Sequence, residues 1–182
     1  MQAGKSSIQF EHPPIITSAA SIVGQTEGEG PLASFFDRVE PDPTFGKKSW
    51  EEAESELQRQ TVQKCLDKAG RQAADVNCLF AGDLLGQIVS TSFGVESFDI
   101  PFFGLYGACS TMGEAMILGA MAAGAGYADR VLALASSHFA SAERQFRFPL
   151  AYGNQRPQST TWTVTGCGCV MIEGNEKNEG KD

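Results

Sequence analysis

The chain has 182 residues, 42% of them hydrophobic, which suits one domain with a real core, or one half of a larger duplicated one. Its net charge is −8, from 22 acidic and 14 basic residues, which argues against nucleic-acid binding and against direct adhesion to anionic lipid. No stretch approaches the roughly 18 continuous apolar residues of a transmembrane helix, and the N-terminus lacks the apolar core of a signal peptide.

The cysteine and histidine content argues against disulfides and metal. Five cysteines are an odd number in a chain without an export signal, so we interpret them as reduced thiols. Cys167 and Cys169 alternate along an expected strand, which puts their thiols on one face. With two histidines in the whole chain, a zinc site is not expected, and we predict neither a metal nor a cofactor.

The first third of the chain predicts a strand, a packed loop and a helix. A strand is expected near Ile15, and Gly, Pro and acidic residues between positions 24 and 43 indicate a packed loop. Residues Ser49–Ala69 form an amphipathic pattern that opens with a Ser49–Glu52 capping box and stops at Gly70. We expect the charged face of this helix to be solvated.

A short buried strand, Val76–Ala81, follows and leads to Asp83. A carboxylate just past a strand end in an α/β sheet lies where ligands usually bind. An Asp in this position can equally cap the next turn or helix, and the sequence leaves both readings open.

A second unit, an apolar strand at Pro101–Tyr106, a tight turn, Cys109 and a Gly/Ala-rich helix, stands at the centre of the chain. Thr111 and Glu114 suggest a capping box, so the helix begins at about Thr111 and Cys109 lies at its N-terminus. Unsatisfied N–H groups and the helix dipole favour an anion there and ease thiol ionisation, although free cysteines are often simply small buried residues. The many glycine and alanine residues of this helix predict close packing against a neighbour and little contact with solvent.

The last third predicts two more strands around a long loop. Arg130–Ser136 is a buried strand, and Trp162–Glu173 is a near-alternating one. Between them, Ser137–Thr161 is a loop of about 25 residues, a length that is usually functional or an interface. The element order predicts an α/β domain with a mixed, mainly parallel sheet.

Several stretches together resemble the stage V sporulation protein AD (SpoVAD) family of endospore-forming bacteria. The resemblance runs from about Phe10 to Ile172, and its most specific stretches are AGDLL at 81–85 and SSHFASAERQFR at 136–147. Further matches are FEHPPI at 10–15, EGPL at 29–32, the Trp50 helix start, PFFGLYGACST at 101–111 and TVTG at 163–166.

The resemblance implies a layered thiolase-like half-domain with a buried central helix. It implies that residues 1–173 form the N-terminal half, with 174–182 a polar tail, and that Cys109 occupies the nucleophile position of related acyltransferases. The histidine and asparagine partners of those enzymes belong to a second half that this sequence does not contain. A second thiolase-like half, or a homodimer partner, is therefore expected to complete the fold.

The resemblance also implies a function. Members of this family are understood as non-catalytic binding components of the SpoVA system, which moves dipicolinic acid (pyridine-2,6-dicarboxylate, as its calcium chelate) into the spore and out during germination. The expected partners are this ligand and the SpoVA membrane proteins, with no nucleic acid. The expected location is the cytoplasmic side of the spore inner membrane, held there through those partners.

Two hypotheses assign different roles to the candidate residues. As a binder, the chain would hold a flat dianion at Cys109, with Arg144 or Arg147, Gln145 and His138 assisting and Asp83 meeting a bound Ca²⁺ or a carboxylate. The arginines could instead form structural or interface salt bridges. As a Cys109-dependent acyltransferase, the chain would need a base near the thiol, and only His138 is a candidate, although a solvent-exposed or capping role is commoner for such a histidine.

Overall fold

A six-stranded mixed sheet forms the middle layer of the computed structural model, which describes residues 1–84, 87–146 and 163–175, with the side chains of 143–146 left out. Three neighbouring pairs of strands run parallel, and β8 (Gly166–Glu173) runs antiparallel to both of its neighbours. The spatial order is β4 (Arg38–Glu40), β3 (Ile15–Gly24), β8, β7 (Arg130–Ser137), β5 (Cys78–Asp83) and β6 (Phe102–Gly104). The predicted α/β class with a mixed, mainly parallel sheet is confirmed.

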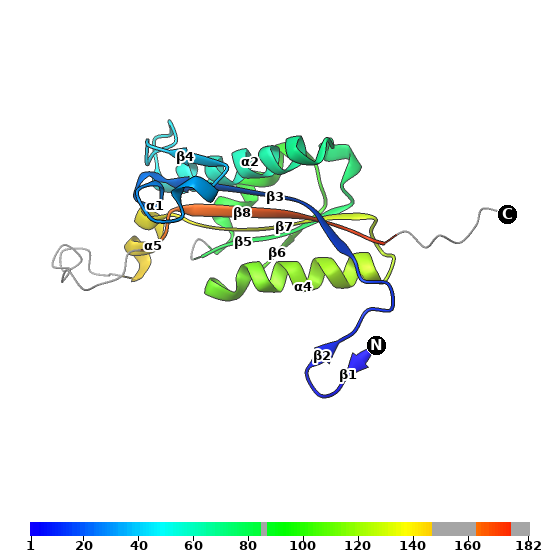
Figure 1. The fold of residues 1–182 in the computed structure, drawn as a ribbon. Coiled ribbons are helices and arrows are strands. Elements are labelled where there is room, and N and C mark those ends of the chain that lie inside the picture. The colour runs from blue at the N-terminus through cyan, green and yellow to red at the C-terminus, as the bar shows by residue number, and fades with distance from the viewer. Residues whose placement is uncertain (85–86, 147–162, 176–182) are drawn as a thin grey trace.

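Helices cover both faces of this sheet (Figure 1). One face carries α2 (Trp50–Ala69) together with the short α3 (Val89–Val95), which packs against it. The other face carries α4 (Thr111–Gly124), which contacts β5, β7 and β8. Smaller elements lie outside these layers: the β1–β2 hairpin (Gln2–Ala3 and Ser7–Ile8), α1 (Gln25–Gly28) and α5 (Phe139–Phe146).

Helix α2 forms as its sequence predicts. The Ser49 hydroxyl accepts from the Glu52 backbone N–H at 3.2 Å and the Glu52 carboxylate accepts from the Ser49 N–H at 3.2 Å, which completes the capping box. Gly70 ends the helix in the left-handed conformation, with a φ of 63° that glycine adopts at little cost. The expectation of a solvated charged face is partly wrong, because Glu54 and Gln58 are buried against the sheet and α3.

Helix α4 approaches the sheet through a column of small residues. Thr111, Ala115, Gly119 and Ala123 are spaced by four and face the strands. A Cβ on Gly119 would stand 3.1 Å from Ile172 Cδ1 and 3.2 Å from Val131 Cγ1, so the helix lies too close for a larger side chain. The inference that these small residues permit close packing is therefore confirmed on the sheet side.

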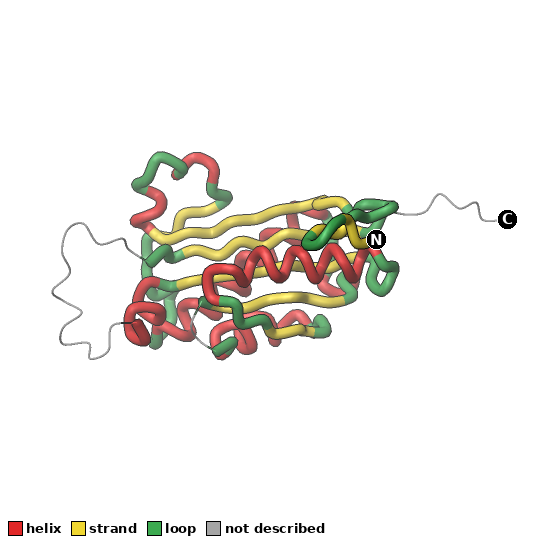
Figure 2. The backbone as a smooth tube through the Cα atoms, turned by 90° about the horizontal axis from the view of Figure 1, so that it is seen from below, coloured by secondary structure: helices red, strands yellow, loops and turns green. Residues whose placement is uncertain are grey.

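The opposite side of α4 is open. Ile117 is 59% exposed and Met121 40% exposed, and a Cβ on Gly113 would meet nothing within 4 Å. Figure 2, which views the molecule from below, shows the helix lying on the strands with its outer face toward the viewer. Within the described part of the chain, the prediction of a helix without solvent contact holds for one face only.

Several boundaries differ from those predicted. Strand β5 runs two residues further than expected and contains Asp83, β6 is limited to three residues, and β8 begins at Gly166. The expected loop from Ser137 begins instead as the last residue of β7 and then helix α5, while 147–162 lie outside the described residues, as does most of the predicted tail. Phe35, expected in a packed loop, is 78% exposed.

Candidate functional site

Cys109 lies in a one-turn 3₁₀ helix, Ala108–Ser110, directly before α4. It is the exposed cysteine of the five, while Cys65, Cys78, Cys167 and Cys169 are buried. The thiol borders a cavity of about 460 Å³ at the C-terminal ends of β5 and β7. The cavity lining consists of small, hydroxyl and apolar residues: Leu84, Ala108, Cys109, Met112, Ala135, Ser136, Ser137, Thr163, Val164 and Gly166.

The turn that presents Cys109 is held by local hydrogen bonds. Thr111 Oγ1 donates to the Ala108 carbonyl at 2.8 Å and accepts from the Gly107 N–H at 3.2 Å. Ala108 has a φ of 48°, an uncommon value for a residue with a side chain and a cost that the surrounding bonds must offset. A Cβ on Gly107 would come within 2.6 Å of Ser110 Oγ, so a larger residue there would displace this hydroxyl from its position in the turn.

The predicted capping box at Thr111 and Glu114 does not form, although the helix begins at Thr111 as expected. Thr111 is the first helical residue and Ser110 is the N-cap, so the predicted pairing is one position out of register. The Ser110 hydroxyl donates backward to the Gly107 carbonyl at 2.7 Å and makes no capping bond. The first-turn N–H groups of α4 thus receive no cap from Ser110, which favours an anion near Cys109.

Asp83 lies on the opposite side of the sheet from the Cys109 cavity. It is fully buried, and its Oδ2 accepts from the Thr91 N–H at 3.0 Å and from Thr91 Oγ1 at 2.8 Å. Because Thr91 is in the first turn of α3, the carboxylate caps that helix, which is the second of the two readings left open by the sequence. Its neighbour Leu84 borders the cavity instead.

A buried polar chain connects Asp83 to α2. Gln58 Nε2 donates to Thr91 Oγ1 at 3.0 Å and to Ser136 Oγ at 2.6 Å, and Ser136 Oγ donates to Glu54 Oε1 at 2.7 Å. Ser141 Oγ donates to the other oxygen of Glu54 at 2.7 Å, which ties the first turns of α5 to α2. Burial raises the pKa of Glu54 to about 7, although the two hydroxyl donors lower it and Asp83 adds to the rise.

Sequence reasoning missed this chain because Glu54 and Gln58 fall outside the apolar stripe of α2. The one available signal was their spacing of four, which puts both residues on one line of the helix beside Leu57 and Thr61. Asp83 Oδ1 and Gln58 Oε1 are buried without a hydrogen-bond partner among the described residues.

His138 is a buried structural residue in this geometry. Its Nε2 lies 2.8 Å from the Pro43 carbonyl and its Nδ1 accepts from the Ala140 N–H at 3.2 Å, which fits a neutral ring with the proton on Nε2. The ring stacks on Trp50 and Phe139, and burial lowers its pKa. It is absent from the Cys109 cavity lining and helps cap α5, one of the commoner roles expected for it.

The remaining candidates lie at the edge of the described chain. Arg144 and Gln145 belong to α5, which follows β7, but their side chains are outside the described residues, as is Arg147 altogether. Across the described ranges, no group of three or more His, Cys, Asp or Glu side chains could hold a metal ion. The described helices also include none that is long and apolar enough to cross a membrane.

Solved structures of condensing enzymes define the class of fold. The chain is similar to the priming β-ketosynthase of the R1128 polyketide pathway, with a TM-score of 0.58 and 14% identity over 93% of this chain and 53% of that one. It is also similar to 3-oxoacyl-[acyl-carrier-protein] synthase III from Aquifex aeolicus VF5 (0.56, 14%, 92% and 55%) and to a variant of OleA from Xanthomonas campestris (0.61, 12%, 91% and 60%). The domain therefore has the thiolase-like fold.

Sequence comparison identifies the family within that class. The family model for stage V sporulation protein AD (SpoVAD) matches residues 4–181. Stage V sporulation protein AD of Bacillus subtilis (strain 168) is 43% identical over 169 residues, which are 93% of this chain and 50% of the relative. The chain belongs to the stage V sporulation protein AD family, and it spans about half the length of that curated relative.

Proposed function

We propose that this chain is part of a non-catalytic dipicolinate-binding component of the SpoVA system, which takes the ligand into the spore and releases it at germination. Membership of the sporulation family supports the biological setting. The observation that carries the site is the exposed Cys109 at the uncapped start of α4, beside a cavity of about 460 Å³.

In the proposed binding mode, backbone N–H groups make the main contact with the ligand and the Cys109 thiol contributes less. A carboxylate of the ligand lies against the first-turn N–H groups of α4, where the helix end stabilises an anion by about 0.3–1 kcal/mol. Thr163 lines the same cavity and can offer its hydroxyl to a second carboxylate, whereas the Ser137 hydroxyl already donates to the Val164 carbonyl. Arg144 or Arg147, with Gln145, supply the charge and hydrogen bonds that a dianion requires.

Asp83 and His138 have a supporting part in this proposal. Both are buried and hydrogen-bonded away from the cavity lining. Asp83 fixes α3 against the end of β5, and His138 fixes the start of α5 against Pro43. They shape the strand ends around the cavity without touching the ligand.

We further propose that a second thiolase-like half, or a second copy of this chain, covers the outer face of α4. Ile117, Met121 and Gly113 leave an open apolar stripe there, and the chain spans about half the length of its relative. Together with SpoVA membrane proteins, this partner would hold the complex at the cytoplasmic side of the spore inner membrane.

A Cys109-dependent acyltransferase is the second candidate, because Cys109 is exposed and the fold is shared with condensing enzymes. Such chemistry needs a base within hydrogen-bond reach of the thiol. Neither histidine of the chain lines the Cys109 cavity, since His138 is committed to Pro43 and His12 lines a separate pocket. Among the described residues, the cavity lining offers no such base.

Calorimetric titration with dipicolinate, with and without Ca²⁺, tests the proposal on the chain together with the protein that completes it. We expect saturable heat, weakened modestly by Cys109→Ala and unchanged by Cys78→Ala, whose thiol is buried elsewhere. No heat at millimolar ligand would contradict the binding function. Turnover of an acyl thioester that is lost in Cys109→Ala would favour the enzyme instead.

A further inference from the structure

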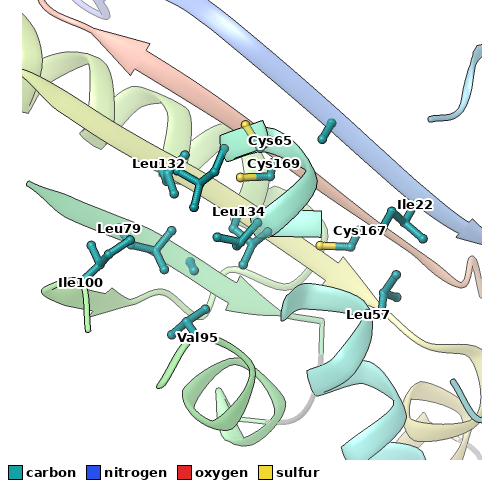
Figure 3. Close-up of a cluster of buried hydrophobic side chains, with 14 of the residues drawn as sticks. Ile22, Leu57, Cys65, Leu79, Val95, Ile100, Leu132, Leu134, Cys167 and Cys169 are labelled. Carbon is teal, nitrogen blue, oxygen red and sulfur yellow. The ribbon is translucent and has the colours of Figure 1, made fainter. Parts of the chain in front are cut away.

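Two of the four buried cysteines face each other across the interface between α2 and the sheet. Cys65 comes from the last third of α2 and Cys169 from β8, an internal strand. Both are fully buried, and both belong to the same hydrophobic core. Figure 3 shows their sulfur atoms side by side, with Cys167 further along the strand next to Leu57 and Ile22.

Hydrogen bonds hold this pair in place. Cys65 Sγ lies 3.7 Å from Ser18 Oγ, and that hydroxyl donates to the Cys65 carbonyl at 2.9 Å, which anchors the helix residue to β3. The neighbouring Cys169 thiol lowers the pKa of Cys65 despite burial, and the neighbouring Cys65 together with burial raises the pKa of Cys169. Cys65 is therefore the more readily ionised of the two thiols.

We propose that Cys65 and Cys169 form a redox-active dithiol that closes to an intramolecular disulfide between α2 and β8 when the chain meets hydrogen peroxide. The Cys65 thiolate attacks one peroxide oxygen and the O–O bond breaks. The departing hydroxide takes up the proton that the Cys65 thiol had lost and leaves as water, so that Cys65 becomes a sulfenic acid. The Cys169 sulfur then attacks Cys65 Sγ, the S–O bond breaks, and a second water leaves. Two thiols are oxidised and one peroxide is reduced.

The neighbouring cysteines provide the contrast that makes this pair specific. Cys167 is on the same strand and face, but its thiol bonds to Thr61, and burial raises its pKa. Cys78 lies in the core on the α4 side of the sheet, and Cys109 is exposed at the turn before α4. Neither is a member of the core that holds Cys65 and Cys169.

Closing this disulfide would fasten α2 to the centre of the sheet. It would close a loop of about 100 residues, a span for which restricting the unfolded chain has a large stabilising effect. Because both thiols are buried, oxidation requires a brief separation of the helix from the sheet. The reaction is therefore expected to be slower than oxidation of Cys109.

Peptide mapping after peroxide treatment tests the proposal. The full-length chain carrying Cys109→Ala, which prevents cross-linking through the exposed thiol, is treated with hydrogen peroxide, denatured, alkylated and digested. We expect loss of two alkylatable thiols, a cross-linked peptide containing Cys65 and Cys169, and a higher unfolding temperature that reverts with dithiothreitol. Cys167→Ala is the matched control and should still cross-link. Cys65→Ala should retain all its thiols, whereas Cys169→Ala should form no cross-link and lose only the Cys65 thiol, as its sulfenic acid.

Three results would overturn the proposal. The first is that Cys65 and Cys169 remain alkylatable after peroxide treatment continued long after Cys109 is fully oxidised in the unmodified chain. The second is a cross-link that includes Cys167, and the third is conversion of Cys65 to a sulfinic acid without a cross-link. If either variant of the pair fails to fold, the thiol count and cross-linked peptide of the Cys167→Ala chain decide the matter alone.

Discussion

The helix layers on the two faces of the sheet differ in how completely they are covered. On the α2 face, the helix and α3 bury a continuous core that includes Leu57, Leu79 and Met171, together with the Glu54–Gln58 polar chain. On the α4 face, one helix packs tightly through small residues and then presents Ile117 and Met121 outward. The chain alone thus buries the α2 face and leaves the outer side of α4 exposed. Cys109 lies on the α4 side of the sheet.

The two faces contribute differently to the stability of the domain. The α2 face supplies the buried area that stabilises the domain, because core burial is the dominant favourable contribution to folding. The α4 face carries a cavity, a residue at positive φ, Ala108, and an open apolar stripe, and our proposal places ligand and partner binding there. Substitutions on the two faces should therefore have different consequences.

The largest expected effect comes from the closed face. Leu57→Ala removes a fully buried side chain from the core and should lower the free energy of unfolding by about 2–5 kcal/mol. Ile117→Ala, on the open face, should change the stability of the isolated chain by less than about 0.5 kcal/mol. Urea denaturation of both variants measures this, and equal losses would contradict the contrast between the faces.

The next effect is a pH dependence that belongs to Glu54. A raised carboxyl pKa means that the folded chain binds the proton more tightly than the unfolded chain, so stability falls as pH rises from about 4.5 to about 7 and stays lower above that range. Glu54→Gln removes this loss, and at pH 8 we expect it to gain on the order of 1–3 kcal/mol relative to its difference from the parent at pH 5.

Glu56 provides a control of opposite sign on the same helix. Its hydrogen bond with Arg59 lowers its pKa to about 2 against the effect of burial, so its contribution is present above the unfolded pKa and is lost as pH falls toward 2. Glu56→Gln should therefore remove stability at neutral pH and not at low pH. Unfolding curves at several pH values check both variants, and a flat profile for Glu54→Gln minus parent would contradict the assignment.

The smallest effects separate the two sides of α4. Gly113→Ala faces open space and should stabilise the isolated chain by up to about 1 kcal/mol, because alanine is the better helix former. Gly119→Val crowds Ile172 and Val131 and should destabilise it by about 1–3 kcal/mol. Thermal unfolding measures both.

The larger variant Gly113→Leu tests whether a partner binds the exposed side of α4. If a partner covers the outer face of α4, this change should weaken assembly with the second half while leaving the isolated chain folded. Analytical ultracentrifugation of the mixture decides this, and unaltered assembly would mean that the partner binds elsewhere.

The sequence predicted those features that depend on neighbours along the chain. The Ser49–Glu52 capping box, the Gly70 stop and the start of α4 at Thr111 are local, and each appears where the pattern indicated. The misplaced Thr111–Glu114 box shows the limit, because the preceding 3₁₀ turn shifts the N-cap by one residue.

Features that depend on tertiary packing were not predictable in the same way. Glu54 and Gln58 lie outside the apolar periodicity of α2, so the sequence predicts that they are on the surface. Only the packing of α3 and α5 shows that they are buried. For Asp83 the sequence left ligand contact and a capping role open, and only the extension of β5 by two residues, which puts Asp83 in the strand facing α3, decides for the cap. His138 was expected in a loop, but it is buried because α5 begins directly after it.

Ligand protection of Cys109 tests dipicolinate binding at the start of α4. The completed complex is alkylated with iodoacetamide at increasing dipicolinate concentrations, and modification of each cysteine is followed by peptide mass spectrometry. We expect dipicolinate to slow alkylation of Cys109 in a saturable way, to leave no covalent adduct on it, and not to alter the slow reaction of the buried Cys78. An alkylation rate at Cys109 that is independent of dipicolinate, or an acyl adduct on Cys109 after incubation with an acyl thioester, would contradict this expectation.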